Sequence, residues 1–345
     1  MRAQALRGFK SHPLRHVAPR RSSTPPPVPA GRFAPSPTGP LHLGNLRTAV
    51  LAWLFARSTG SRFVMRVEDV DRNAARDHHV RSHLADLRSL GLDWDGEVVR
   101  QSGRFRRYEA ALDRLTAAGD LYPCYCTRRE VAAAAAAPHG PLPEGAYPGT
   151  CRRLTAAERA ARETGGRRPA WRARASGERV EVVDRLHGRS AGMVDDFVVR
   201  RGDGTPAYQI AVVIDDAAQG IGEVVRGDDL LDTTPRQVWL ARRLDLPVPA
   251  YAHVPLVLGP DGQRLAKRHG AVTLADLAAA GVGPAEVLGA LAASLGLAEP
   301  GEPVGSVRRL VDRFDPAALP GRPWTLAAAT LDPGPSPATP TAPRT

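Results

Sequence analysis

The segment from Arg32 to Asn45 contains residue types that suit nucleotide binding. It reads RFAPSPTGPLHLGN and stands between an expected strand and an expected helix. Gly44 would let a ligand approach the backbone closely, and the amino end of the following helix favours phosphate. His42 could donate a hydrogen bond to a phosphate oxygen as negative charge develops there. The segment therefore predicts a phosphate-binding turn.

The elements that must position this turn alternate between strand and helix. Strands are expected over residues 31–37, 61–67, 180–183, 196–200 and 207–214, and helices over residues 41–57, 75–90, 103–118, 234–244 and, with interruptions, 272–312. A β-α-β-α order predicts an α/β fold with a doubly wound parallel sheet. Such sheets bind ligands at the carboxyl ends of their strands, which is where the turn falls.

Charged residues elsewhere in the chain are further candidates for chemistry. Glu68 is the first acidic residue of the chain and follows the expected strand 61–67, so its carboxylate could pair with a cationic group of a ligand. Arginine occurs 45 times and lysine only at Lys10 and Lys267, so a single arginine is weak evidence of function. Lys267 is more notable for the same reason.

The three cysteines, Cys124, Cys126 and Cys151, fall within 28 residues. An odd number cannot form a closed set of disulfides, and a metal site is the alternative. With Tyr147, the pattern is C-x-C…Y-x-x-x-C, which could complete a tetrahedral shell. His139 or Glu144 could supply the fourth donor instead, and three buried free thiols are the remaining interpretation.

Composition limits the class of protein. Of 345 residues, 43% are hydrophobic and 24% charged, which is typical of a globular chain. Residues 1–30 and 321–345 are rich in proline and are expected to be disordered, although a transit peptide is an alternative for the first. No run is long enough for a membrane span and none resembles a secretory signal, so we expect a cytoplasmic protein. A net charge of +11 is compatible with a nucleic-acid partner.

Two motifs carry a family resemblance. PSPTGPLHLGN resembles the first nucleotide-binding signature of class I aminoacyl-tRNA synthetases of the glutamyl branch, and RLAKRHG, residues 264–270, resembles their second, mobile ATP loop. The sequence departs from the usual motifs at three positions: Asn45 stands where the first signature has histidine, and Arg264 and Ala266 stand where the second loop has lysine and serine. The resemblance covers residues 31–320 and implies a Rossmann-like class I synthetase catalytic domain with a zinc-binding insertion and a small C-terminal helical domain.

The resemblance also implies an order of domains. These are a disordered extension (1–30), the first half of the Rossmann domain (31–120), a zinc-binding insertion that meets the acceptor (121–199), the second Rossmann half (200–258), the second ATP loop with a helical stem-contact domain (259–320), and a disordered tail (321–345).

The same resemblance assigns site residues. Glutamate would bind to Arg32, Phe33, Ala34, Pro35, Ser36, Glu68, Tyr208 and Arg226. ATP would bind to His42, Gly44, Asn45, Arg264 and Lys267, of which His42 and Lys267 would be catalytic. Two arginines and one carboxylate match a substrate with two carboxylates and one amine. Which arginine binds which carboxylate stays open. The other acids near this site, Asp69, Asp71, Asp215 and Asp216, could equally cap helices or pair with surface arginines.

The cysteine pattern resembles that of truncated glutamyl-synthetase relatives, the glutamyl-Q tRNA(Asp) synthetases, and only about 50 residues expected to be structured follow Gly270. In that family Cys124, Cys126, Tyr147 and Cys151 would hold one Zn²⁺ per chain. The implied activity is Mg²⁺- and ATP-dependent formation of glutamyl-adenylate without tRNA, then transfer of glutamate to queuosine at the wobble position of tRNA(Asp), by a monomer. The alternatives are a short glutamyl-tRNA synthetase that charges a tRNA 3′ end and a silent tRNA-binding paralogue.

A basic stretch beside the cysteines is a candidate surface for tRNA phosphates, although a solvated helix face is an equal alternative for any one member. Its members are Arg152, Arg153, Arg159, Arg162, Arg167, Arg168, Arg172 and Arg174.

Overall fold

The computed structural model describes residues 29–135, 146–175, 177–265, 269 and 272–326. Most of the two expected tails lies outside these residues, and so do Lys267, His139 and Glu144. The predictions made for those positions therefore have no structural counterpart below.

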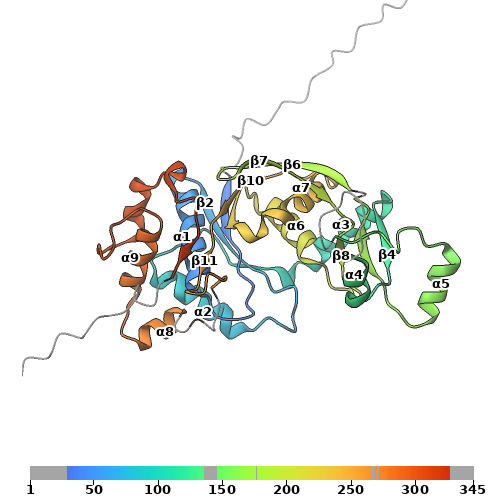
Figure 1. Ribbon diagram of the computed structural model, residues 1–345, viewed down its shortest axis with the longest axis horizontal. Coiled ribbons are helices and arrows are strands. Elements are labelled where there is room, and N and C mark those ends of the chain that lie inside the picture. Colours follow the sequence, from blue (N-terminus) through green and yellow to red (C-terminus); the bar gives the residue numbers. More distant parts are fainter. Residues whose placement is uncertain (1–28, 136–145, 176, 266–268, 270–271, 327–345) are drawn as a thin grey trace, which may run out of the picture.

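One twisted sheet forms the centre of the molecule (Figure 1). In spatial order its strands are β3 (Val99–Arg100), β2 (Arg62–Val67), β1 (Ala30–Phe33), β9 (Glu223–Gly227), β10 (Ala250–Val254), β6 (Glu178–Asp184) and β7 (Gly188–Val194). All of the pairings are parallel except that of β6 with β7. The contact between β1 and β9 is made by a parallel bridge from Ala30 to Ile221, just before β9 begins. The fold is thus the expected α/β class.

This strand order creates a crevice between β1 and β9. From β1 the chain continues to β2 on one side, whereas from β9 it continues to β10 on the other side. Such a reversal is where open α/β sheets bind their ligands. The turn that begins at Phe33 and the turn that begins at Gly227 both leave the sheet at this point.

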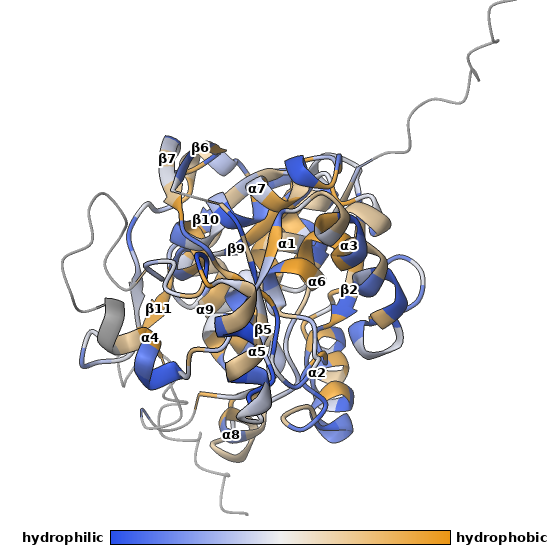
Figure 2. Ribbon diagram, turned by 90° about the vertical axis from the view of Figure 1, so that its right-hand side faces the viewer, coloured by the Kyte–Doolittle hydropathy of each residue, from blue (hydrophilic) through white to orange (hydrophobic). Residues whose placement is uncertain are grey.

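Helices cover both faces of the sheet, as the alternation of side chains along the strands shows. Phe63 and Met65 of β2 pack with helix α1 (Leu43–Ser58), whereas Val64 between them packs with the opposite core. That opposite core contains α3 (Phe105–Ala117), α6 (Tyr208–Gln219) and α7 (Thr234–Arg243). α1 is apolar on every side because it lies between the sheet and the C-terminal region, and its residues appear orange in the middle of Figure 2.

The segment 207–214, expected as a strand, is instead the start of helix α6, and the prediction was wrong. The apolar run YQIAVVI fits a buried strand or a buried helix equally well by periodicity. The helix extends for 12 residues, beyond the apolar run, and ends before Gly220, whose φ of 68° provides a left-handed C-cap.

A smaller antiparallel sheet lies at one end of the molecule. It contains β4 (Leu121–Cys124), β5 (Ala170–Ala173) and β8 (Val198–Arg200), and carries helices α4 (Arg128–Ala135) and α5 (Ala156–Thr164) (Figure 1). Strands β6 and β7 also fall in the range 121–199, yet they join the main sheet beside β10. The expected insertion therefore contributes strands to both sheets.

The opposite end is helical. It contains α8 (Leu274–Ala279), α9 (Pro284–Ser294) and the 3-10 helices η4 (Val307–Arg313) and η5 (Pro316–Ala318), while α2 (Asp77–Ser89) lies beside it (Figure 1). Strand β12 (Trp324–Thr325) returns to pair with β11 (Val257–Leu258). Two 3-10 turns, η1 (Gln101–Gly103) and η2 (Asp228–Thr233), complete the elements used below. None of the described helices has both the length and the apolar character that a membrane crossing requires.

Candidate active site and candidate metal centre

A cavity of about 670 Å³ opens at the carboxyl ends of β1 and β9. This is the size of ordinary small-molecule sites. Its walls include every predicted substrate and nucleotide residue except Lys267, which is not described: Arg32, Phe33, Ala34, Pro35, Ser36, His42, Gly44, Asn45, Glu68, Tyr208, Arg226 and Arg264. The fold thus brings together five segments that are separated in sequence, around residues 32–45, 68, 208, 226 and 264, while the roles of the individual residues stay predictions.

His42 and Asn45 close the amino end of α1 with a capping box. The His42 Nδ1 atom accepts the backbone N–H of Asn45 at 3.3 Å, and the Asn45 Oδ1 atom accepts the backbone N–H of His42 at 3.1 Å. Burial and the charge of Arg264 lower the pKa of His42, so its ring is neutral near pH 7. Because Nδ1 is an acceptor, the ring proton is on Nε2, which leaves that N–H available as a donor.

The capping box explains two features of the motif. Asn45, which replaces the usual histidine, supplies the side chain that returns to the His42 backbone. A Cβ atom on Gly44 would lie 2.9 Å from Cε1 and 3.0 Å from Nδ1 of His42. Glycine is needed here because the His42 ring occupies the space that a Cβ atom would take. This reason adds to the one expected from the sequence, the close approach of a ligand to the backbone.

The base of the cavity holds a buried cluster of opposite charges. Arg66 donates to Asp216 at 2.7 Å and to Glu68 at 3.4 Å, and Arg32 Nε lies 3.5 Å from the same Asp216 carboxylate. Arg32 also donates to the carbonyl of Val225 at 3.0 Å, which ties β1 to β9. Sequence reasoning missed Arg66 and Asp216 as parts of the site, although both stand in segments that it singled out.

Arg226 is held differently, because its contacts are neutral. Its Nε donates to His253 Nε2 at 3.0 Å, its Nη1 to Gln237 Oε1 at 2.8 Å and its Nη2 to Thr234 Oγ at 2.8 Å. The guanidinium carbon also lies 5.5 Å from the ring centre of Tyr251. Arg226 therefore keeps a positive charge that no carboxylate in direct contact neutralises within the described chain.

The charges of the cavity complement those of glutamate. Three buried arginines, Arg32, Arg66 and Arg226, face two buried acids, Glu68 and Asp216, which leaves one net positive charge. Glutamate carries one net negative charge at neutral pH. Burial raises the pKa of Glu68 despite the charges of Arg66 and Arg32, so this carboxylate is sensitive to pH.

The four acids near the site all have structural partners. Asp69 accepts the N–H and hydroxyl of Ser102, and Asp71 pairs with Arg201 at 2.9 Å. Asp215 accepts from Gln101, Arg104 and Tyr108 beneath α3. Asp215 is buried and pairs with the partly exposed Arg104, whereas Asp216 pairs with the buried Arg66 and bears on the site because it contacts Arg32.

The second ATP loop is described only in part. Arg264 lines the cavity, and its Nη1 lies 2.5 Å from a carboxylate oxygen of Asp229. Leu258 and Arg264 form an antiparallel bridge, so the loop between them is a short hairpin after β11. Arg264 thus lines the same cavity as His42, and their roles as two parts of one nucleotide site stay a prediction.

Cys124, Cys126 and Cys151 form a cluster in which all three sulfur atoms lie within 4.8 Å of one another. The Tyr147 hydroxyl lies 3.4 Å from Cys124 Sγ and 3.5 Å from Cys126 Sγ, and Cys126 and Cys151 are 3.4 Å apart. A tetrahedral zinc site with bonds of about 2.3 Å to sulfur and 2.0 Å to oxygen has edges of about 3.5–3.8 Å. The donor set therefore fits a metal ion, and the fourth predicted donor is in place.

Tyr147 lies under a basic residue of the stretch that was expected to contact tRNA. The guanidinium of Arg172 is 3.7 Å from the Tyr147 ring centre and donates to the carbonyl of Asp196 at 2.7 Å. Arg172 is buried, so it packs the cysteine cluster and does not form part of an exposed basic surface. Arg153, Arg167 and Arg168 are exposed and remain candidates for phosphate contacts.

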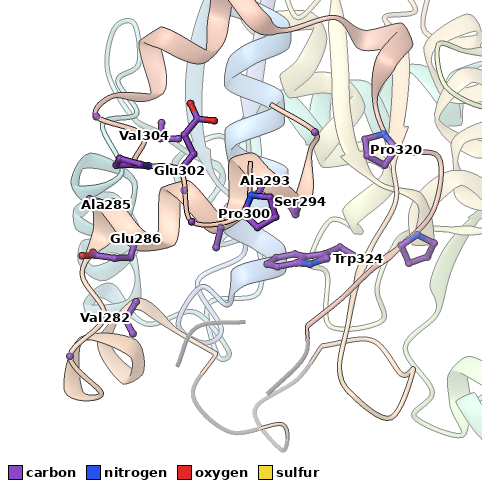
Figure 3. Close-up of a pocket in the computed structure, with 18 of the residues that line it drawn as sticks. Val282, Ala285, Glu286, Ala293, Ser294, Pro300, Glu302, Val304, Pro320 and Trp324 are labelled. Carbon is purple, nitrogen blue, oxygen red and sulfur yellow. The ribbon is translucent and has the colours of Figure 1, made fainter. Parts of the chain in front are cut away.

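A second cavity, of about 820 Å³, lies in the C-terminal region and has a different character. Figure 3 shows Trp324 lying across from Pro300 and Ser294, with Val304 farther away beside Glu302. None of the predicted site residues lines it. The charged cavity at the sheet edge is therefore the candidate active site.

The chain resembles known proteins over nearly all of its described length. Residues 30–302 match the family of class I tRNA synthetases (E and Q), catalytic domain. A relative from Nocardia farcinica named glutamyl-Q tRNA(Asp) synthetase is 63% identical over 297 residues, covering 86% of this chain and 93% of that protein. One of the same name from Symbiobacterium thermophilum is 53% identical over 313 residues, covering 87% and 97%.

A solved structure shares the fold. The crystal structure of a glutamate tRNA ligase from Elizabethkingia meningosepticum in complex with its amino acid aligns with a TM-score of 0.75 at 24% identity, covering 88% of this chain and 68% of that one. At this identity the likeness concerns the arrangement of the backbone.

Proposed function

We propose that this chain, which belongs to the class I tRNA synthetases and within them to the glutamyl-Q tRNA(Asp) synthetases, activates L-glutamate with ATP and transfers it to queuosine in tRNA(Asp). Membership of the family makes it an ATP-dependent ligase with glutamate, ATP and tRNA as its partners. The observation that carries the proposal is the cavity between β1 and β9, where one net positive charge lies beside a helix amino end.

In the first step the α-carboxylate of glutamate attacks the α-phosphorus of ATP, and the bond to pyrophosphate breaks. The products are glutamyl-adenylate and pyrophosphate. The Nε2–H group of neutral His42 donates to a phosphate oxygen as charge develops, and the amino end of α1 adds its partial positive charge. Lys267 and Arg264 neutralise the departing pyrophosphate. Mg²⁺ bound to ATP would neutralise phosphate charge. Catalysis is then by positioning and electrostatics.

Selection of glutamate follows from the arginines. Glu68 accepts the substrate ammonium group, while Arg32 and Arg226 pair with the two carboxylates. A glutamine side chain would place an amide N–H₂ group against a guanidinium, so donors would face donors and a buried charge would lack its partner. Tyr208, on the cavity wall at the start of α6, would cover the substrate.

In the second step a hydroxyl of the cyclopentene ring of queuosine attacks the carbonyl carbon of the adenylate, and AMP leaves. The acceptor is proposed from the names of the relatives that are 63% and 53% identical. Exposed arginines beside the small sheet, Arg153, Arg167 and Arg168, would contact tRNA phosphates. A monomer in the cytoplasm is the expected state of the enzyme.

The cysteine cluster is proposed to hold one Zn²⁺ through Cys124, Cys126, Tyr147 and Cys151. Four protein donors complete a tetrahedral shell, and a closed shell is typical of structural zinc. The ion would cross-link the end of β4 to the segment before α5. It would thereby hold the small sheet in a fixed arrangement for contact with the tRNA. It would take no part in activation.

Glutamate-dependent exchange of pyrophosphate into ATP, measured without tRNA, tests the first step. We expect exchange with glutamate and less than about 1% of that rate with glutamine, because the unpaired charge costs about 3 kcal/mol or more. Absence of exchange in zinc-loaded protein would favour a silent paralogue. A strict requirement for tRNA would favour a short glutamyl-tRNA synthetase.

A further inference from the structure

Arg226 projects into the cavity from a network of buried polar side chains that the motifs do not include. His253, on β10, is fully buried, and Asp184, at the end of β6, is 2% exposed. Both strands lie beyond β9 in the sheet, so neither residue reaches the cavity wall. Among the described residues, they connect to the cavity through Arg226, whose Nε lies 3.0 Å from His253 Nε2, an atom that also lies 3.1 Å from Thr234 Oγ1.

Asp184 fixes the state of the histidine ring. One of its oxygens accepts both the backbone N–H of His253 at 3.0 Å and the ring Nδ1–H at 2.6 Å. The other accepts the N–H groups of Leu186 and His187 at 2.9 and 3.0 Å. With four donors aimed at it, this carboxylate stays ionised and holds the ring proton on Nδ1, so Nε2 has a lone pair to offer.

The neutral acceptor has a consequence that a carboxylate would not have. Had an acid contacted Arg226 directly, its charge would cancel the one that the substrate carboxylate needs. His253, Gln237 and Thr234 together occupy one N–H on each nitrogen of Arg226, which leaves two N–H groups without an assigned partner in the described chain. The guanidinium is thereby fixed in place while its charge remains available.

We propose that His253, oriented by Asp184, is a positioning residue that fixes the Arg226 guanidinium for a carboxylate of the amino acid substrate. This inference rests on the proposed function and extends it to residues outside the synthetase motifs. The Asp184–His253–Arg226 relay, as we name these three residues, runs across three adjacent strands, β6, β10 and β9. The two strands that lie beyond β9, β10 and β6, therefore fix the orientation of the Arg226 guanidinium.

Two substitutions of the same residue separate the two hydrogen bonds of the ring. The amide of H253N can still donate to Asp184 but is too short to accept from Arg226, whereas the longer amide of H253Q can place its carbonyl oxygen where Nε2 stands. In pyrophosphate exchange, we expect H253N to raise the KM for glutamate about 10- to 100-fold, the effect of losing one hydrogen bond to a buried charge, and H253Q less than about 5-fold. The KM for ATP should stay within about twofold in both.

A neighbouring histidine provides the matched control. His187 bonds to the backbone oxygen of His253 at 3.0 Å but has no contact with Arg226. H187Q should leave the KM for glutamate within about twofold of wild type. Equal KM values for H253N and H253Q, or a shift in the KM for ATP as large as that for glutamate, would overturn the proposal, because a merely structural histidine predicts that pattern.

A second measurement does not depend on activity. In ¹⁵N-histidine NMR of the whole protein at pH 7, we expect the His253 signals, assigned by their loss in H253Q, to report a neutral ring with its proton on Nδ1. D184N should change this state, because an amide can stabilise the other tautomer. A charged ring, or a proton on Nε2 in the wild type, would overturn the relay. If wild-type protein shows no exchange, the proposed function fails, and the NMR result still decides the relay.

Discussion

The substrate cavity and the cysteine cluster both bury polar groups, but they satisfy them in different ways. In the cavity, charged side chains have partners from distant segments, as when Arg66 of β2 pairs with Asp216 of α6. In the cluster, the sulfur atoms and the Tyr147 hydroxyl mainly contact one another. The cavity is therefore organised by contacts between segments, whereas the cluster would be held together by the metal ion that we propose for it.

The two regions also differ in the protonation state of their ligand-binding groups. Burial raises the pKa of Cys126 to about 12, so this thiol is protonated near pH 7 until a metal displaces the proton. The neutral contacts of Arg226, in contrast, leave its charge ready for a substrate. We infer that substitutions in the cavity change substrate binding first, and that substitutions in the cluster change stability and metal content first.

The largest expected effect is in the cavity. Among the described arginines that line the cavity, Arg226 is the one whose direct contacts are all neutral. Arg226→Leu should therefore lower kcat/KM for glutamate about 100- to 1,000-fold in pyrophosphate exchange, as expected for one partner of a buried charge pair. Arg243→Leu on α7 is the control, because Arg243 pairs with Glu178 at the surface and should have little effect. A loss below threefold for Arg226→Leu would contradict the organised cavity.

In the cluster, we expect loss of metal and of stability. Cys126→Ser should reduce bound zinc from one equivalent to less than half and lower the Tm by roughly 5 °C or more, because a zinc site couples metal binding to folding. Tyr147→Phe should also weaken zinc binding, which tests the oxygen donor.

Tyr125→Phe is the control for the cluster, since its hydroxyl bonds to Glu163 and not to the sulfurs. Metal analysis by atomic emission and thermal denaturation give the two readouts. Unchanged stability after chelation would mean that the cysteines are ordinary buried thiols.

The pH dependence of glutamate binding should come from Glu68. The pKa of this carboxylate is raised by burial, and an ammonium group binds only to its ionised form. The KM for glutamate should therefore increase as the pH is lowered through the range in which Glu68 becomes protonated, by up to about tenfold per unit below the pKa. Glu68→Gln should have a higher KM that is nearly independent of pH over this range, and a parallel pH profile in this variant would assign the effect elsewhere.

The sequence predicted the local parts of both regions. The turn from Arg32 to Asn45 and the C-x-C…Y-x-x-x-C pattern bring donors together within short segments, and the structure places them as expected. Periodicity also predicted the alternation of strand and helix in the first half, where β1, α1 and β2 follow one another.

The parts that the sequence did not predict depend on distant contacts. Asp216 and Arg66 are 150 residues apart, and Asp184 and His253 are 69 apart. Each looks like a common polar residue until the sheet order is known. The strand expected at 207–214 failed for a related reason, because an apolar run that is buried on all sides has no period that separates a strand from a helix.

The smallest expected effect is on tRNA. Charge reversal of two exposed arginines, Arg153→Glu with Arg168→Glu, should weaken tRNA binding by about tenfold and leave pyrophosphate exchange unchanged, because phosphate contacts act through charge. Arg179→Glu on the main sheet is the control. Equal losses in binding and exchange would indicate that the basic stretch is structural.

The central claim is that glutamate activated in the cavity is transferred to queuosine in tRNA(Asp). The most direct measurement supplies labelled glutamate, ATP and zinc-loaded protein to tRNA(Asp) with and without queuosine, followed by nuclease digestion to locate the label. We predict label only in the modified tRNA and only in the anticodon-loop fragment. Label at the 3′-terminal adenosine, or equal labelling of the unmodified tRNA, would contradict the account.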